Sequence, residues 1–223
     1  MNGSAPHEPG ASRDIGPAAT YLADLTNAIA RIDVAALERF VVTVVEALTE
    51  RRGIFVAGNG GSATAASHIA SDWAAATNML GGPVNVHCLS DNTARLTSLA
   101  NDTSFEEVFS RQVEAMGRPG DLLVLLSVSG QSPNLVRAVK SARALDIGVL
   151  ALVGYPGALA NLCDTWIELG EGDYGLAEDL HIAVNHMVVR AMQGGVPQVY
   201  RPDEATPNRW AKRRDTDGKR GVS

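Results

Sequence analysis

Apolar residues recur every three or four positions in the N-terminal part of the chain, over residues 18–32 and again over 35–48. This spacing places them on one face of a helix and predicts two amphipathic helices. From residue 54 onward the pattern changes to short apolar runs, each followed by a polar or glycine-rich turn and a stretch with helical spacing. That order is typical of a parallel α/β sheet.

The apolar runs predict strands, and the stretches between them predict helices. The expected strands are residues 54–57, 84–88, 122–127, 149–153 and 165–168. The expected helices are residues 62–77, 91–100, 105–116, 132–145, 157–162 and 176–192. The run LLVLL, residues 122–126, is apolar throughout, as in strands that are covered on both faces. The pattern therefore predicts an α/β protein with a three-layer, doubly wound, five-stranded parallel sheet after an N-terminal helical pair.

The two ends of the chain lack this periodicity. Residues 1–17 are rich in Gly, Pro, Ser and Ala, and residues 197–223 are polar, with a KRR cluster and Trp210. Such segments do not bury enough apolar surface to fold. We expect a disordered lead-in, a single domain over residues 18–196 and a flexible C-terminal tail.

Composition and charge narrow the class of protein. The chain is 45% hydrophobic and 20% charged, with a net charge of −6 and a pI near 5.3. This acidity disfavours nucleic acid as a partner, because binding to its phosphates needs a basic surface. No apolar run reaches the roughly 20 residues of a membrane helix, and a signal peptide is not recognisable. Because Cys88 and Cys163 lie in apolar runs and are expected to be reduced, we expect a cytoplasmic protein without a membrane partner.

Two loops that follow predicted strands are suited to binding a phosphate. They are GNGGS, residues 58–62, and SVSGQS, residues 127–132. Ligands of open α/β sheets bind at the carboxyl ends of strands, and the free N–H groups at the start of the next helix favour an anion. The serine hydroxyls add further donors. An alternative role for Ser132 is to cap the helix that starts at Pro133, and this is compatible with binding a phosphate monoester.

The first loop also matches a dinucleotide-binding pattern. Gly58, Gly60 and Ala63 fit G-x-G-x-x-A, but that pattern needs an acidic residue about 20 positions later to hold the ribose. Here Asp91 follows Gly58 by 33 positions. A nicotinamide-dependent enzyme therefore ranks second.

Histidines and acids lie together on two of the predicted helices. His68 and Asp72 are four residues apart, so they share one helix face and could hold one ion, although such a pair is more often a surface hydrogen bond or ion pair. On the last helix, Glu178, His181 and Asn185 share one side, so spacing alone would pair His181 with Glu178. The alternative for His181 is a packing role in the core.

Four segments carry a resemblance to a known family. In order along the chain they are GNGGSATAASHIASDW, ANDTSFEEVFSRQVEAMGRPGD, SVSGQSPNLVRAVKSARALDIGVLALVG and EDLHIAVNHM. In them the chain resembles the bacterial phosphoheptose isomerases, also called sedoheptulose 7-phosphate isomerases, of the sugar isomerase (SIS) superfamily. The resemblance covers roughly residues 18–193, and residues 101–120 make it more specific than any glycine loop. It implies a five-stranded parallel sheet, a homotetramer with active sites shared between subunits, and a sugar-phosphate substrate.

The resemblance also implies roles for particular residues. It places the substrate at Asn59, Gly60, Gly61, Ser62, Asn101, Asp102, Ser127, Val128, Ser129 and Ser132. Many family members hold zinc with residues that match His68, Asp72, Glu178 and His186. It thus favours His186 over His181 as the metal ligand. Asp72, Glu178 and His186 are the expected catalytic residues of a ketose–aldose isomerisation through an enediol(ate).

Two positions depart from the family pattern. Asp72 stands where the family has Glu and is one methylene shorter, and Glu178 stands where the family has Gln. Two carboxylates would fully neutralise Zn²⁺ and weaken it as a Lewis acid. We hypothesise that the carbon base is Asp72 or Glu178, with Glu178 compensating for the shorter acid and His186 serving the sugar oxygens. The product is expected to be the manno heptose, with the altro epimer as an alternative.

Two other functions compete with this prediction. Some proteins similar to phosphoheptose isomerases are non-catalytic tetramers that bind the replication initiator, and other SIS enzymes isomerise different phosphosugars. The His and acid residues are all able to do chemistry, which favours an enzyme. Residues 101–120 favour the heptose enzyme over an isomerase of another sugar.

Overall fold

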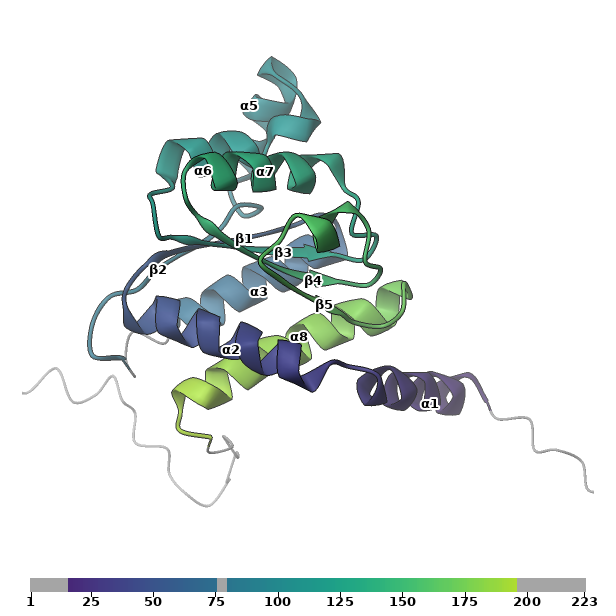
Figure 1. The fold of residues 1–223 in the computed structure, drawn as a ribbon. Helices are drawn as coiled ribbons and strands as arrows, with labels where there is room; N and C mark the ends of the chain where they lie inside the picture. Colours follow the sequence, from purple (N-terminus) through teal and green to yellow (C-terminus); the bar gives the residue numbers. More distant parts are fainter. Residues whose placement is uncertain (1–15, 76–79, 196–223) are drawn as a thin grey trace, which may run out of the picture.

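Five parallel strands form one sheet in the order β2-β1-β3-β4-β5 (Figure 1). The computed structural model describes residues 16–75 and 80–195. The strands are β1 (Gly53–Gly58), β2 (Asn85–Cys88), β3 (Leu122–Ser127), β4 (Gly148–Val153) and β5 (Thr165–Glu168). The predicted strands are therefore all present, within one residue at each end. The strand order reverses between β1 and β3, and at such a switch point open α/β sheets form their ligand crevice.

Helices cover both faces of the sheet, as predicted for a three-layer fold (Figure 1). Helices α2, α3 and α8 lie on one face, and α6 and α7 lie on the other. The α-helices are α1 (Pro17–Ala30), α2 (Val34–Thr49), α3 (Gly61–Ala75), α5 (Thr93–Asp102), α6 (Ser110–Met116), α7 (Pro133–Ala144) and α8 (Tyr174–Met192). The 3-10 helices are η1 (Phe105–Glu107) and η2 (Ala158–Asn161).

Alternate residues of the strands belong to two separate hydrophobic cores, one on each face of the sheet. In β1, Ile54 and Val56 pack with α2, α3 and α8, whereas Phe55 and Ala57 pack with α6 and α7. Every residue of β1 and β3 is buried. The continuous apolar runs in the sequence thus reflect burial on both faces of the sheet, as expected.

The predicted helix over residues 105–116 is wrong as a continuous element. The chain forms η1, then bends at Phe109 before α6 begins at Ser110. Val108 and Phe109, between the two elements, are both buried against the α7 side of the sheet. The Ser110 hydroxyl donates to the Glu107 carbonyl at 3.1 Å across the bend. The helix predicted over 157–162 is likewise only the short η2.

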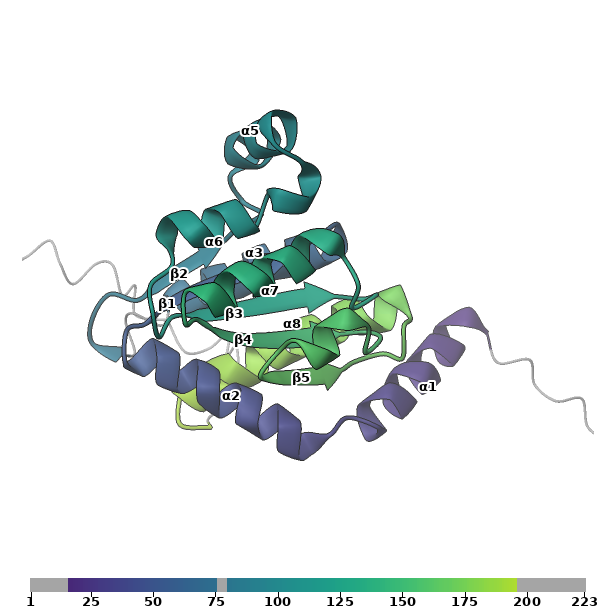
Figure 2. The same ribbon diagram turned by 45° about the horizontal axis from the view of Figure 1, so that its top comes forward.

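Helices α1 and α5 extend beyond the layered body (Figure 2). α1 is tied to α8 where the Tyr21 hydroxyl donates to the Asp179 carboxylate at 2.8 Å. The predicted terminal segments lie outside the described residues, except residues 16 and 17, and so do positions 76 and 77 of the predicted helix 62–77. The single domain over 18–196 stays a prediction. Among the described helices, none combines the length and apolar character needed to cross a bilayer.

Both cysteines are free thiols, as predicted, but they are half-buried. Burial raises the pKa of Cys88 to about 11 and that of Cys163 to about 12. Both thiols are therefore protonated at neutral pH, and a thiolate nucleophile is not expected at either position.

The Asp121 carboxylate joins the start of β1 to the turn before β3. It is buried and accepts hydrogen bonds from the backbone N–H groups of Gly53, at 2.7 Å, and Arg118, at 2.8 Å. Asp121→Ala leaves both donors unpaired and is expected to lower the free energy of unfolding by roughly 2–4 kcal/mol in urea denaturation. Asp24→Ala, on the exposed face of α1, is the control. A loss below about 0.5 kcal/mol for Asp121→Ala would contradict the assignment.

Candidate active site

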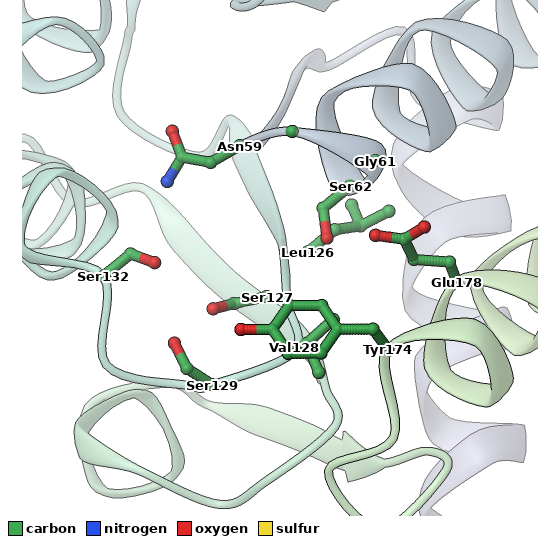
Figure 3. A pocket seen from close by; sticks show the side chains of 11 residues that line it. Asn59, Gly61, Ser62, Leu126, Ser127, Val128, Ser129, Ser132, Tyr174 and Glu178 are labelled. Carbon is green, nitrogen blue, oxygen red and sulfur yellow. The ribbon is translucent and has the colours of Figure 1, made fainter.

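A polar cavity lies at the carboxyl ends of β1 and β3, where the strand order reverses (Figure 3). Its volume is about 280 Å³. The lining residues are Asn59, Gly60, Gly61, Ser62, Leu126, Ser127, Val128, Ser129, Ser132, Tyr174 and Glu178. Both loops predicted to bind a phosphate thus contribute to one cavity. None of these lining residues is a lysine or an arginine.

The first loop is held in place by a pair of amide side chains. Asn59 and Asn134 exchange two hydrogen bonds, of 3.0 and 2.9 Å, and Asn134 is buried at the start of α7. Gly60 has a φ of +55°, a conformation that side chains disfavour. The Asn59 amide therefore ties the β1 loop to the helix that follows β3. Sequence reasoning did not identify Asn134.

The second loop turns its serines toward the cavity (Figure 3). The Ser127 hydroxyl accepts a hydrogen bond from the Gly130 N–H at 3.1 Å, and the Ser129 hydroxyl accepts one from the Gln131 N–H at 3.3 Å. Ser132 occupies the N-cap position of α7 with Pro133 after it, but its side chain makes no capping hydrogen bond. The capping role considered for this hydroxyl is therefore wrong, and it lines the cavity instead.

Glu178 forms the opposite wall of the cavity (Figure 3). Its carboxylate lies so close to the first residue of α3 that a Cβ atom added to Gly61 would be 2.2 Å from Oε1. Only glycine leaves room for the acid there. The carboxylate is also placed at the positive end of the α3 dipole, which favours an anion. Tyr174, one turn before Glu178 on α8, lines the same wall and was missed, although its spacing of four residues from Glu178 was visible in the sequence.

His68, Asp72 and His186 meet at the junction of α3 and α8. One donor atom from each lies within 4.8 Å of the others. His68 Nε2 is 3.3 Å from Asp72 Oδ2, and the rings of His68 and His186 are 5.8 Å apart. Two imidazoles and a carboxylate are ligands that zinc commonly takes. The donor set therefore fits the predicted metal in three of its four residues.

The other predicted residues lie apart from this trio. Glu178 is not part of it, but Glu178 and His68 both line a cavity of about 390 Å³ beside the first one. Asn101 and Asp102 are exposed at the end of α5 and hydrogen-bond to each other at 2.9 Å. They are not among the residues that line the main cavity of their own chain.

His181, the residue favoured by spacing alone, is fully buried in the core. Burial lowers its pKa to about 4, and the backbone of Leu152 opposes the shift only in part. Neither ring nitrogen reaches a partner in hydrogen-bond geometry within the described residues. The core role considered for His181 thus describes its position, while His186 is the histidine that faces His68.

Comparisons with known proteins identify the family of this chain. The SIS domain family matches residues 20–154. A phosphoheptose isomerase of Chlorobaculum parvum is 36% identical over 181 residues, which cover 78% of this chain and 85% of the relative. The chain belongs to the phosphoheptose isomerase family. A second relative of that name, from Nitratidesulfovibrio vulgaris strain Miyazaki F, is 39% identical over 145 residues, covering 64% of this chain and 70% of the relative.

A solved phosphoheptose isomerase has the same fold. The structure from Neisseria gonorrhoeae superposes with a TM-score of 0.70 at 30% identity, over 79% of this chain and 97% of that one. The sequence-based assignment to this enzyme family and to its α/β fold is confirmed. The nicotinamide-dependent alternative rested only on the glycine pattern of the first loop. That loop lies within the residues that match the SIS domain family, so the pattern needs no second explanation.

The buried His181 makes the stability of this protein depend on pH. The pKa of His181 is about 4 in the folded state, below the usual 6.5. Between these two pH values the unfolded chain therefore binds a proton at His181 that the folded chain does not. The contribution of neutral His181 to the free energy of unfolding is fully present above pH 6.5 and is lost as the pH falls toward 4. Between pH 6.5 and 5 the loss from this group is about 2 kcal/mol.

Urea denaturation at pH 7 and pH 5 measures this effect. His181→Leu is expected to reduce the pH dependence by about that amount, whereas His87→Leu, on the exposed edge strand β2, leaves it unchanged. An equal pH dependence in wild type and His181→Leu would contradict the burial argument.

Proposed function

We propose that this protein is a ketose–aldose isomerase that converts sedoheptulose 7-phosphate into a D-glycero-heptose 7-phosphate. The observation that carries the proposal is the division of the cavity between hydroxyl and N–H donors on one wall and the Glu178 carboxylate on the other. A phosphosugar has the same division, with an anion at one end and the reacting carbons at the other. The names of the relatives support the heptose as the sugar.

The phosphate is assigned to the loop of residues 127–132. The start of α7 supplies backbone N–H groups and the positive end of a helix dipole, and Ser129 and Ser132 supply hydroxyls. The start of α3 is less suitable, because Glu178 already places a negative charge there. Repulsion between the two anions orients the sugar with its phosphate away from the carboxylate.

The reacting carbons are then next to Glu178, which we assign as the carbon base. It takes the proton from C1 of the ketose to give the enediol(ate) and returns it to C2, while O1 loses a proton and O2 gains one. Asp72 is the alternative, but it does not line the cavity, and its carboxylate is held by the Asn185 amide. His186 does not line this cavity either. It is assigned to the proton transfers at the two oxygens because its ring faces His68, which lines the adjoining cavity together with Glu178.

The trio of His68, Asp72 and His186 is the proposed zinc site. Its donor types and their mutual separation fit the metal. A bound zinc ion would polarise the carbonyl of the open-chain sugar. Glu178 is the fourth ligand expected from the family pattern, but it lies outside the trio and is assigned to the carbon chemistry. The cavity that it shares with His68 supports its position beside the proposed metal site.

We further propose a homotetramer whose subunits share active sites. Asn101 and Asp102 match substrate-binding residues of the family, but they lie on the projecting α5 and do not line the cavity of their own chain. In the proposed assembly they complete the cavity of a neighbouring copy. This explains how exposed polar residues far from the pocket contribute to it.

Incubation of the zinc-loaded protein with sedoheptulose 7-phosphate tests the activity. NMR is expected to show an aldoheptose 7-phosphate, of the manno configuration that the family resemblance implies. Measuring metal content and oligomeric state on the same sample tests zinc and the tetramer. An altro product would revise the stereochemistry alone, and no product at any protein concentration would refute the proposed function in favour of a binding protein.

Substitutions at Gly61 and Glu178 test the carbon base. Glu178→Gln removes the base and is expected to lower kcat by about 10²–10⁴-fold. Gly61→Ala keeps the acid but displaces its carboxylate, so kcat is expected to fall by roughly 100-fold while the fold is retained. Gly148→Ala is the control, because its Cβ would meet Leu122 Cδ1 at 3.4 Å, the Asp121 carbonyl oxygen at 3.7 Å and Asp164 Oδ2 at 4.0 Å, all ordinary contact distances.

The alternative base gives a different pattern. Full turnover in Glu178→Gln, together with its loss in Asp72→Asn, would assign the carbon base to Asp72. Glu178 would then be a ligand at most.

A further inference from the structure

Asn185 is a buried amide that reaches across from α8 to the acid of the proposed metal site. Its side chain is fully buried, and its Nδ2 donates a hydrogen bond to Asp72 Oδ2 at 2.6 Å. The two residues are 113 positions apart, so the contact exists only because α3 packs against α8. This hydrogen bond joins the Asp72 side chain to α8.

The hydrogen bond fixes which way the Asp72 carboxylate faces. Asp72 Oδ2 receives the Asn185 amide and also lies 3.3 Å from His68 Nε2. A carboxylate that is held at one oxygen loses rotation about its last bond, and its other oxygen then points in one direction. Outer partners of this kind orient metal ligands in proteins.

The chemistry of an amide suits this task better than that of a charged group. An amide N–H donates without adding charge, so Asp72 keeps its full negative charge for a cation. A lysine at position 185 would neutralise the acid, and a carboxylate would repel it. Asn185 therefore orients the ligand without competing with the metal.

The burial of Asn185 is unfavourable for folding alone. Its Oδ1 is buried without a hydrogen-bond partner among the described residues. Leaving a buried polar atom unpaired costs free energy, whereas a leucine of similar shape would leave none. Asn185 also directly precedes His186, so the same turn of α8 carries the contact to Asp72 and the ring that faces His68.

We propose that Asn185 is a positioning residue that holds the Asp72 carboxylate in the orientation in which it binds zinc with His68 and His186. Asn185 compensates in this way for the short acid at position 72. The inference rests on the proposed metal site. It adds to that site a residue which touches neither the metal nor the sugar.

Zinc affinity, measured by competition with a chromogenic chelator, tests the inference without an activity assay. Asn185→Leu is expected to weaken zinc binding by about 10–100-fold, the usual effect of losing an outer partner of a metal ligand. Asn185→Ala, which removes the donor with less bulk, is expected to do the same and is the second variant should the leucine disturb folding. His181→Leu changes a buried polar residue one turn away on the same helix and is expected to leave the affinity unchanged.

A double-mutant cycle separates positioning from general damage to the structure. In an Asp72→Ala background, Asn185→Leu is expected to have no further effect on zinc affinity, because it acts only through Asp72. Unchanged affinity in the single variants, or an equal loss with and without Asp72, would overturn the inference. Zinc binding that persists undiminished in His68→Ala would refute the metal site itself, and the positioning role with it, irrespective of the isomerase activity.

Discussion

Helices α3 and α8 pack against each other on one face of the sheet, and the site depends on this contact. At the start of α3, Gly61 has no side chain, and the Glu178 carboxylate fills the space. Further along, Asp72 receives the Asn185 amide. Small residues such as Ala65 and Ala66 lie in the core between these contacts and allow the helices to approach closely. The acids and histidines of both helices are thus brought together by one interface.

The cavity that we propose for the phosphosugar has donors for an anion but no basic side chain in its lining. No lysine or arginine is among its lining residues, and the donors are hydroxyls and the N–H groups at the start of α7. Fixed dipoles provide this attraction without the mobility of a long basic side chain. The placement of Glu178 at the start of the other helix makes the two ends of the cavity different. Binding and chemistry can therefore occupy opposite walls.

The contacts of Asp72 change the interpretation of its shortness. The family pattern suggested that the extra carboxylate at Glu178 compensates for an acid that is one methylene shorter. Glu178 instead lies against Gly61 and lines the main cavity, outside the trio of side chains that we propose to hold zinc. The residue in contact with Asp72 is Asn185, which the helical spacing had placed on the same side as Glu178. The two departures from the family pattern thus belong to different tasks, with Glu178 proposed for the carbon chemistry and Asp72 for the metal.

The strands, most of the helices and the two loops could be predicted from the sequence alone. Strands such as β3 are continuously apolar because both faces are buried, and their turns are rich in glycine and serine, so periodicity alone located them. The family resemblance added most of the proposed site residues, including the choice of His186 over His181. Local patterns failed at residues 108 and 109, where the chain leaves η1 and begins α6 although the apolar spacing predicted one continuous helix.

Which side chains meet depends on the tertiary structure and could not be predicted from local patterns. The Asn59–Asn134 amide pair, the approach of Glu178 to Gly61, and the Asp72–Asn185 bond each join segments that are far apart in the chain. No periodicity encodes them, because they depend on the strand order and on how closely two helices pack. The sequence shows that Tyr174 and Asn185 lie on the last helix. That Tyr174 lines the cavity and that Asn185 contacts Asp72 follows only from the packing of that helix.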